Sequence, residues 1–418
     1  MKAVAIVDGE HYVAVVRHAL AELPYDFIAA VLIGGQEKLR GGEDYAIPLV
    51  ADVESAIAQH APDVVVDLSD EPVLGPPERL ALASRVLALG VPYVGADFRF
   101  DPPERVAVST PSIAVVGTGK RVGKTAVTGH LARLLAADRD VVVVAMGRGG
   151  PPDPEVVTVP PTVESLVELS RSGRHAASDH LETAALVGVA TVGCRRCGGG
   201  LAGAVATSNV TEGARIAAGL DPDVVLFDGS GAALPPVAAD RTVVVVGSHQ
   251  DPRVAAGYLN AYRLLLADLV VVTMAEPGSG WNEVCAAAKS AARSGVPIVA
   301  TMLRPRPLVD VRGRRVAYFC AAPDDAHARI RAHLEDHHGA VVVHVSGNLS
   351  NRHALHDELE RISADVYLVE LKAAAIDVVA EVALARNADV VLAANDVVPL
   401  PGQPGLDEIL LGMAKFQE

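Results

Sequence analysis

Residues 117–125 read Gly-Thr-Gly-Lys-Arg-Val-Gly-Lys-Thr, the residue types of a phosphate-binding loop. The loop follows an apolar run at residues 113–116 and leads into an amphipathic segment, which is the strand, loop and helix context that such a loop requires. Small residues let backbone N–H groups surround phosphate oxygens, Lys124 would reach the β- and γ-phosphates, and Thr125 would hold Mg²⁺. The alternative is a glycine-rich turn. The predicted nucleotide-binding residues are Gly117, Thr118, Gly119, Lys120, Arg121, Val122, Gly123, Lys124 and Thr125.

The loop departs from the common G-x-x-x-x-G-K-[ST] pattern because Thr118 stands at its first position and the glycines fall at 117 and 119. This variant resembles the loop of dethiobiotin synthetase and its relatives, which activate small acids with ATP.

Two further carboxylates are candidate metal ligands. Asp228 ends an apolar run at 224–228 and precedes Gly-Ser-Gly, so it could hold Mg²⁺ beside Thr125 or simply cap a turn. The other is Asp153 or Glu155, both in the Gly- and Pro-rich segment 146–155, in which Arg148 would add positive charge for an anion.

The segment 172–182 is dense in polar and titratable groups and directly precedes an apolar helical pattern. Ser178 or Asp179 would cap that helix, with Glu182 completing a capping-box-like arrangement. Capping does not account for Arg174, His175 and His180. We expect Arg174 to bind an anion, and a histidine near phosphates can donate hydrogen bonds or move protons.

Cys194 and Cys197 have the C-x-x-C spacing of a zinc or redox site. A structural zinc site needs four ligands, and Cys285 and Cys320 are isolated in the sequence, so a closed site is not expected. Arg195 and Arg196 lie between these cysteines and precede three glycines. We interpret the two arginines as an anion clamp, with an ordinary surface pair as the alternative.

Composition sets limits on the partners. The formal net charge of −15 argues against nucleic acid or an anionic membrane as the main partner, whereas residues 117–200 contain ten Lys or Arg against eight Asp or Glu. The start of the sequence lacks signal-peptide architecture and no apolar run reaches membrane length, so we expect a cytoplasmic protein with reduced cysteines.

A chain of 418 residues is too long for one compact core. Continuous apolar runs that alternate with helical patterns predict an α/β fold with parallel sheets covered on both faces. We expect a Rossmann-like domain at 1–105, a P-loop NTPase-like parallel-sheet domain at 106–338 and a C-terminal α/β segment at 339–418. In the first domain, residues 8–11 and 34–35 lie at strand ends, where they either bind a ligand or only form turns.

Five segments together resemble the cyclic 2,3-diphosphoglycerate synthetase family: the phosphate loop, Gly-Arg-Gly-Gly-Pro-Pro, Ala-Ser-Asp-His-Leu-Glu-Thr-Ala, Gly-Cys-Arg-Arg-Cys-Gly-Gly-Gly-Leu-Ala-Gly and Asp-Gly-Ser-Gly-Ala-Ala-Leu-Pro-Pro. The opening Ala-Ile-Val-Asp-Gly-Glu-His-Tyr is also similar to that family. The resemblance covers most of the chain and is weakest after about Leu303.

The resemblance implies a homodimer and the ATP-dependent closure of 2,3-bisphosphoglycerate to its internal phosphoanhydride, with release of ADP and phosphate. Mg²⁺ is expected as a cofactor from the loop threonine and the nearby carboxylates. Two polyanions must meet, so cationic side chains should neutralise them in a site closed to water. The alternatives are a ligase similar to dethiobiotin synthetase, or a metallochaperone or switch NTPase. The predicted catalytic residues are Lys124, Lys120, Arg148, His175 and His180. The predicted substrate-binding residues are Arg121, Arg148, Arg174, Arg195 and Arg196. The predicted metal ligands are Thr125, Asp228 and Asp153.

Overall fold

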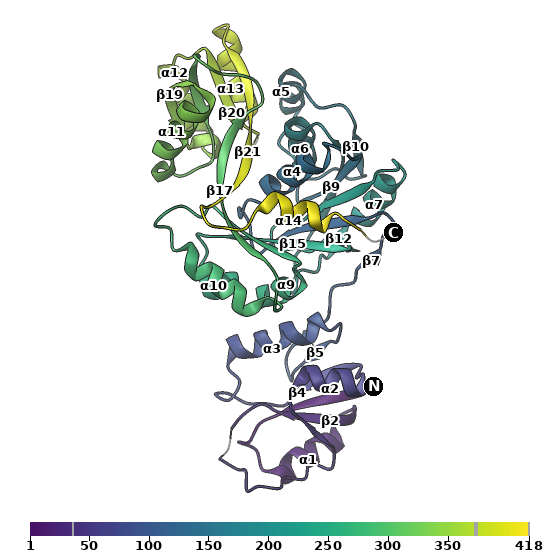
Figure 1. Cartoon of the computed structure of the whole chain (residues 1–418). Helices are drawn as coiled ribbons and strands as arrows, with labels where there is room; N and C mark the ends of the chain where they lie inside the picture. Colours follow the sequence, from purple (N-terminus) through teal and green to yellow (C-terminus); the bar gives the residue numbers. More distant parts are fainter. Residues whose placement is uncertain (36, 372–374, 417–418) are drawn as a thin grey trace.

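The computed structural model describes residues 1–35, 37–371 and 375–416 of the chain (Figure 1). Its N-terminal unit, below the larger body in Figure 1, is a sheet in the order β3-β2-β1-β4-β5-β6. The strand order reverses between β1 and β4, as in Rossmann-like folds. The elements are β1 (Lys2–Val7), α1 (Val13–Glu22), β2 (Asp26–Leu32), β3 (Leu49–Val50), α2 (Val53–His60), β4 (Val64–Asp67), α3 (Pro76–Ala88), β5 (Tyr93–Val94) and β6 (Arg99–Phe100).

The larger body begins with the strands and helices around the phosphate loop. They are β7 (Val106–Ala107), β8 (Ser112–Gly117), α4 (Lys124–Leu135), β9 (Val141–Gly147), β10 (Glu155–Val157), α5 (Val163–Arg171), α6 (Asp179–Val187), β11 (Ala190–Cys197), β12 (Thr207–Ser208), α7 (Val210–Ala218), β13 (Val224–Asp228), β14 (Val237–Ala238), β15 (Arg241–Gly247), α8 (Pro252–Ala255), α9 (Asn260–Leu266), β16 (Leu269–Thr273) and α10 (Trp281–Ala291).

The remaining elements complete the larger body, and those between residues 315 and 385 form its upper part in Figure 1. They are β17 (Ile298–Pro307), β18 (Arg315–Phe319), α11 (His327–His338), β19 (Val341–Ser346), α12 (Arg352–Arg361), β20 (Val366–Glu370), α13 (Ile376–Ala385), β21 (Asp389–Pro399) and α14 (Leu406–Met413). One sheet runs through the whole body in the order β10-β11-β9-β13-β8-β15-β16-β17-β21-β20-β18-β19.

The Val-rich strands explain this sheet. Strands β8, β9, β13 and β16 are buried along their whole length, and they pair in parallel with their neighbours. Alternate residues of these strands belong to two different apolar clusters, one on each face of the sheet. The predicted α/β class with a P-loop-type parallel sheet is therefore confirmed, with antiparallel pairing added at β10, β12 and between β17 and β21.

The long strands β17 and β21 connect the two halves of the body, and their register runs from Thr301 opposite Pro399 to Pro307 opposite Ala393. Although β18 and α11 precede residue 338, they pack with β19 and β20. Helix α14, near the C-terminus, packs against α4 of the P-loop half of the body. The domain limits stay a proposal, and this packing favours a C-terminal unit that starts near Pro307 rather than at 339.

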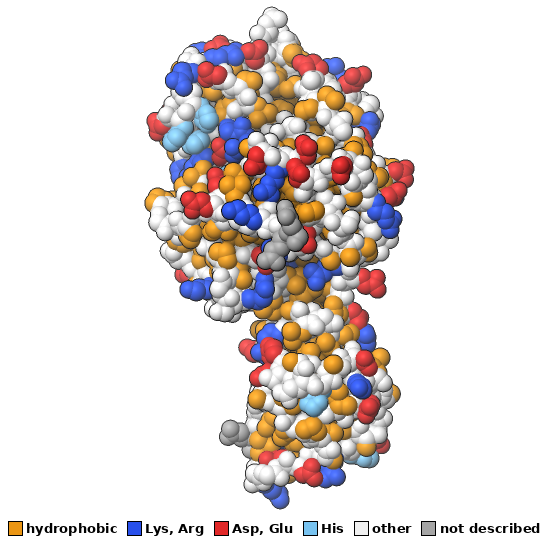
Figure 2. Space-filling model, turned by 45° about the vertical axis from the view of Figure 1, so that its right-hand side comes forward, with side chains coloured by type: hydrophobic (Ala, Val, Ile, Leu, Met, Phe, Trp, Pro, Cys, Tyr) orange, Lys and Arg blue, Asp and Glu red, His pale blue; other side chains and the backbone are white. Residues whose placement is uncertain are grey.

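The N-terminal unit contacts the body through α3 and α9, where the Ser84 hydroxyl donates to the Tyr258 carbonyl at 3.0 Å. Acidic and basic side chains are interspersed over the face seen in Figure 2, and the molecule narrows at this junction. Among the described residues, no helix has the length and apolar character needed to cross a membrane.

Candidate active site

The phosphate loop lies where the sequence predicts it, between the buried strand β8 and helix α4. Gly123 precedes the helix with φ +81°, a backbone conformation that favours glycine. A Cβ atom on Gly117 would come within 2.9 Å of the Lys124 side chain. Lys124 is 9% exposed, and its ammonium donates to the Gly119 carbonyl at 3.3 Å. The lysine therefore lies across the loop that would hold the phosphates.

Neighbouring elements fix the shape of this loop. The Thr118 hydroxyl donates to Gln250 at 2.6 Å, and the Asn260 amide at the start of α9 donates to the Thr118 carbonyl at 3.1 Å. The Thr273 hydroxyl, at the end of β16, donates to the Val122 carbonyl at 2.7 Å. Only Lys120 and Arg121 at the loop tip are exposed, and Arg121 has φ +61°. The loop is thus preorganised, with two cations directed to solvent at its tip.

Asp228 ends β13, the strand that pairs directly with β8. Its side chain is 2% exposed and accepts a hydrogen bond from Thr128 at 3.1 Å. Burial raises the pKa of Asp228 to about 7, with a further contribution from the charge of Asp179, while Lys124 acts in the opposite direction. A buried carboxylate beside other acids is an environment that a divalent cation would stabilise.

Two further carboxylates lie near Asp228, and the sequence interpretation assigns both to helix capping. Asp179 and Glu182, on the first turn of α6, both act electrostatically on Asp228. Ser178 occupies the N-cap position, as one of the two predicted candidates, but it makes no side-chain capping bond, and Asp179 and Glu182 lie in the first turn. The spacing of Asp179 and Glu182, three residues apart before an apolar helix, was the available signal, since it places both on one helical face.

The predicted metal ligands are thus only partly together. Thr125 and Asp228 flank the end of β8, whereas Asp153 is exposed in the loop after β9. A Cβ atom on Gly147, at the end of β9, would lie 3.4 Å from the Asp179 carboxylate. Among the described residues no group of three or more His, Cys, Asp or Glu side chains is already arranged around one metal position.

The predicted anion clamp separates into two different arginines. Strand β11 pairs with β9 so that Arg195 lies opposite Gly147 at the carboxyl edge of the sheet. Arg195 is exposed, whereas the Arg196 guanidinium donates to the carbonyls of Gly198 at 2.7 Å and Ser230 at 2.9 Å. Burial lowers the pKa of Arg196, and the charge of Arg148 lowers it further, so these two arginines lie near each other.

The remaining predicted residues lie around Glu155. Arg174 is exposed and donates to the Glu155 carboxylate at 3.4 Å, and His175 lies against Gly149. His180 is 4% exposed and packs against Gly193 of β11, where a Cβ atom would come within 2.5 Å of its ring. Burial lowers the pKa of His180, and its Nε2 lies 4.0 Å from Glu155. His180 therefore contributes to the packing of α6 against β11.

The C-x-x-C cysteines do not share an environment. Cys194 is buried against Gly213 of α7, and burial raises the pKa of its thiol to about 12. Cys197 is exposed at the end of β11. This arrangement gives no support to the metallochaperone alternative, because one thiol is held protonated in an apolar core.

Comparison with known proteins gives matches over most of the chain. The family model of the P-loop domain of cyclic 2,3-diphosphoglycerate synthetase matches residues 112–290, and the models of its N-terminal and C-terminal domains match residues 2–101 and 307–396. The last match covers the part in which the sequence resemblance is weakest.

Full-length relatives agree. Proteins described as cyclic 2,3-diphosphoglycerate synthetase from Rubrobacter xylanophilus, Thermococcus gammatolerans and Methanothermus fervidus are 50%, 44% and 40% identical, and each alignment covers 99% of this chain and 97% of the relative. A solved DUF1611 family protein from Anabaena variabilis aligns at 16% identity and a TM-score of 0.24 over 71% of this chain and 95% of that one, which is too low to bear on the fold. The chain belongs to the cyclic 2,3-diphosphoglycerate synthetase family.

Proposed function

We propose that this protein catalyses the ATP-dependent synthesis of cyclic 2,3-diphosphoglycerate from 2,3-bisphosphoglycerate, with release of ADP and phosphate. Family membership over the full chain is the observation on which this proposal depends most, because all three domains of the family have their counterparts here. The preorganised loop around Lys124 supports the use of ATP, since its N–H groups and ammonium suit a triphosphate.

The reaction balances in two displacements. In the first, an oxygen of one substrate phosphate attacks the γ-phosphorus of ATP, and the bond to the β–γ bridging oxygen breaks to release ADP. This step leaves a pyrophosphate group on one oxygen of glycerate. In the second displacement, an oxygen of the other substrate phosphate attacks the pyrophosphate phosphorus that is bonded to the glycerate oxygen. Inorganic phosphate leaves, and the internal anhydride closes.

Both displacements bring together groups that are already negatively charged. The protein's contribution is to position these anions and to offset their repulsion, because phosphoryl transfer needs little covalent chemistry from side chains. Lys124 lies across the phosphate loop, while Arg148, Arg195 and Arg196 lie at the neighbouring strand ends. We assign the triphosphate of ATP to Lys124 and the phosphate loop, and the bisphosphate to the three arginines.

We assign the magnesium ion to the acidic side of this site, where the carboxylates would have to converge on it, since no three of them are grouped around one position in the described residues. Thr125, Asp228, Asp179 and Glu182 would hold it, and Asp153 stays a candidate from the sequence alone. Burial, and after it the charge of Asp179, raises the pKa of Asp228, which supports this assignment because a bound cation would stabilise the ionised carboxylate. Bound Mg²⁺ would neutralise phosphate charge next to Lys124. The homodimer and the cytoplasmic location remain proposals from the family resemblance and the composition.

The decisive experiment is ³¹P NMR of the protein with Mg-ATP and 2,3-bisphosphoglycerate. We expect a new pair of anhydride resonances together with equimolar ADP and phosphate, and no product from Lys124→Ala. Lys289→Ala, an exposed lysine on α10, is the control and should behave as wild type. ATP turnover that is indifferent to the bisphosphate, without an anhydride signal, would refute the function and favour another small-acid ligase.

A further inference from the structure

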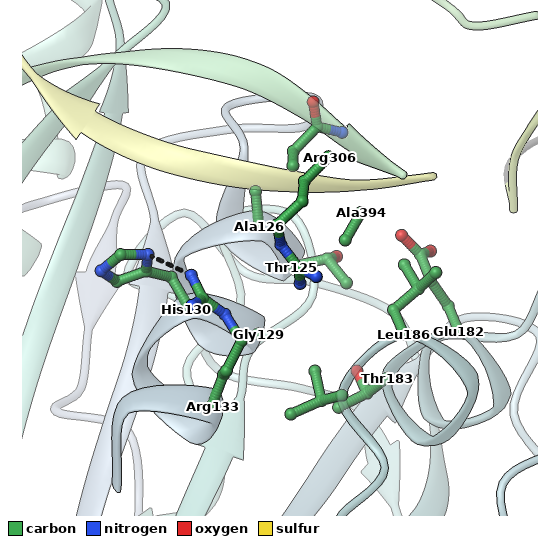
Figure 3. Close-up of a pocket in the computed structure, with 12 residues that line it drawn as sticks. Thr125, Ala126, Gly129, His130, Arg133, Glu182, Thr183, Leu186, Arg306 and Ala394 are labelled. Carbon is green, nitrogen blue, oxygen red and sulfur yellow. Dashed lines mark hydrogen bonds between the residues drawn. The ribbon is translucent and has the colours of Figure 1, made fainter. Parts of the chain in front are cut away.

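A cavity of about 40 Å³ runs beside the phosphate loop, between α4, α6 and the paired strands β17 and β21 (Figure 3). Thr125 lines it at the start of α4, and Gly129 and Arg133 continue its wall along one face of the same helix. Thr183 of α6 and Arg306 of β17 close the other sides. The cavity therefore lies between the P-loop half and the C-terminal half of the body, and both halves line it.

The cavity has an excess of positive charge at its arginine side. Arg133 and Arg306 both donate to the same oxygen of Asp396, each at 2.9 Å. One carboxylate thus faces two guanidinium groups, and each guanidinium keeps further N–H donors for another acceptor. In Figure 3, Arg306 reaches from the β17–β21 pair towards Thr125 and Ala126.

Thr183 supplies an independent sign of a ligand. Its side chain is 1% exposed, and its hydroxyl oxygen has no hydrogen-bond partner within the described part of the chain. A buried hydroxyl without a partner costs free energy, so such a group usually faces a ligand or an ordered water. Because Thr183 lines the cavity, the missing partner would lie inside it.

The acidic residue in the lining, Glu182, lies at the end of the cavity that is opposite Arg133. Glu182 acts on Asp228, so it lies at the end where Thr125 begins α4, whereas Arg133 lies eight residues further along the helix, about 12 Å away along its axis. Arg306 lies between these two ends, because it reaches towards Thr125 and shares Asp396 with Arg133, so an anion bound by the arginines would lie beside a cation held near Glu182. Room for one water requires roughly 10–15 Å³, so a cavity of about 40 Å³ has more room than one water needs and can admit a small anionic group.

We propose that this cavity is a second phosphate subsite, in which Arg306 and Arg133 bind one phosphate group and Thr183 donates a hydrogen bond to it. The inference deepens the proposed function, on which it rests. The group is either the second phosphate of the bisphosphate or the inorganic phosphate that leaves in the second displacement. In both cases the C-terminal half of the chain supplies a binding residue for chemistry at the phosphate loop.

The test compares Arg306→Ala and Thr183→Val with the control Arg304→Ala. Arg304 lies two residues earlier on the same strand, pairs with Glu276 and does not line the cavity, and Glu276 retains Arg329 at 3.5 Å when Arg304 is removed. Arg306→Ala leaves Asp396 paired with Arg133, and Thr183→Val keeps the side-chain shape, so both variants should fold.

The measurements are the KM for 2,3-bisphosphoglycerate, the inhibition constant of inorganic phosphate, and calorimetric binding of inorganic phosphate without ATP. We expect Arg306→Ala to raise either the KM for 2,3-bisphosphoglycerate or the inhibition constant of inorganic phosphate by about tenfold or more. Thr183→Val should raise the same constant by less. A higher KM alone identifies the substrate phosphate, and a higher inhibition constant alone identifies the released one.

The inference is overturned if Arg306→Ala matches Arg304→Ala in both constants. If the wild-type protein forms no cyclic product, the proposed function fails separately, and the calorimetric comparison still decides the subsite. Equal binding of inorganic phosphate to wild type and Arg306→Ala would then rule it out.

Discussion

The Thr128 hydroxyl donates to the Asp228 carboxylate at 3.1 Å, and Thr128 lies one turn after Lys124 on α4. This contact joins the phosphate-loop helix to the end of the neighbouring strand β13, next to Asp179 and Glu182. Asp228 can accept this bond while it is protonated. Its ionisation in the buried site costs free energy unless a cation is present.

Asp228 should make the stability of the metal-free protein depend on pH. The carboxyl has a pKa of about 7 when folded and near 3.8 when unfolded. The stabilisation from its bound proton is therefore complete below about pH 4 and is lost as the pH rises to 7. We expect Asp228→Asn to flatten the fall of Tm between pH 5 and 8 in EDTA, as thermal unfolding would show, and to abolish synthesis.

A matched control for this series is Asp240→Asn, because Asp240 accepts hydrogen bonds from Ser112 at the opposite end of β8. That variant should lower Tm without changing its pH slope over the same range. A wild-type Tm that is constant from pH 5 to 8 in EDTA would show that Asp228 is not held protonated.

Asp179 and Glu182 should set the requirement for Mg²⁺. Asp179→Asn and Glu182→Gln each remove one carboxylate from the acidic side, and we expect the Mg²⁺ concentration for half-maximal activity to rise roughly tenfold or more. Asp153→Asn should change it far less, because Asp153 is exposed in the loop after β9. The readout is the initial rate at saturating ATP as Mg²⁺ is varied, with Glu168→Gln on the exposed face of α5 as control. A larger effect at Asp153 would restore the ligand set predicted from the sequence.

The phosphate loop and Asp228 could be predicted because their signals are local. An apolar strand, a Gly-Lys-Thr loop and a helix stand consecutively in the sequence. A carboxylate at the end of a buried strand is costly unless a polar or cationic group offsets its charge, so Asp228 stands out from the apolar run before it. Parallel order then brings the strand ends to one edge of the sheet.

Arg306 could not be found in this way, and the only local signal for Asp179 and Glu182 was their three-residue spacing. Capping is a sufficient local role for the two acids, and only the packing of α6 beside α4 directs them to Asp228. Arg306 lies far along the chain on β17, and its approach to Thr125 depends on the antiparallel pairing with β21. The boundary predicted at residue 338 is not visible in the packing, because β18 and α11 on one side of it pack with β19 and β20 on the other.

The cysteines should differ sharply in reactivity. Cys197 is exposed, whereas burial raises the thiol pKa of both Cys194 and Cys320 to about 12 and that of the partly buried Cys285 to about 11. We expect one fast-reacting thiol per native chain with a chromogenic disulfide, lost in Cys197→Ser, and unchanged synthesis in that variant. Near-stoichiometric zinc in the purified protein that disappears in Cys197→Ser would contradict this expectation and require a metal site at β11.

Arg195 and Arg196 should respond differently to removal, although they are adjacent on β11. Arg195 is exposed, and its side chain has no hydrogen-bonded or ion-paired partner among the residues that the structure describes. Arg195→Ala should therefore leave Tm unchanged and raise the KM for 2,3-bisphosphoglycerate by roughly tenfold or more, with little effect on the KM for ATP. Arg196 instead holds the carbonyls of Gly198 and Ser230, so Arg196→Ala should also lower stability by about 1–3 kcal/mol.

Arg215→Ala, an exposed arginine on α7, controls for the loss of one positive charge and should change neither quantity. Steady-state kinetics with each substrate varied, together with thermal unfolding of the same preparations, separate the two roles. The clamp interpretation holds if Arg195 affects only binding of the bisphosphate while Arg196 affects both binding and Tm. It fails if Arg195→Ala is indistinguishable from Arg215→Ala, because the exposed guanidinium at the sheet edge would then contact no substrate.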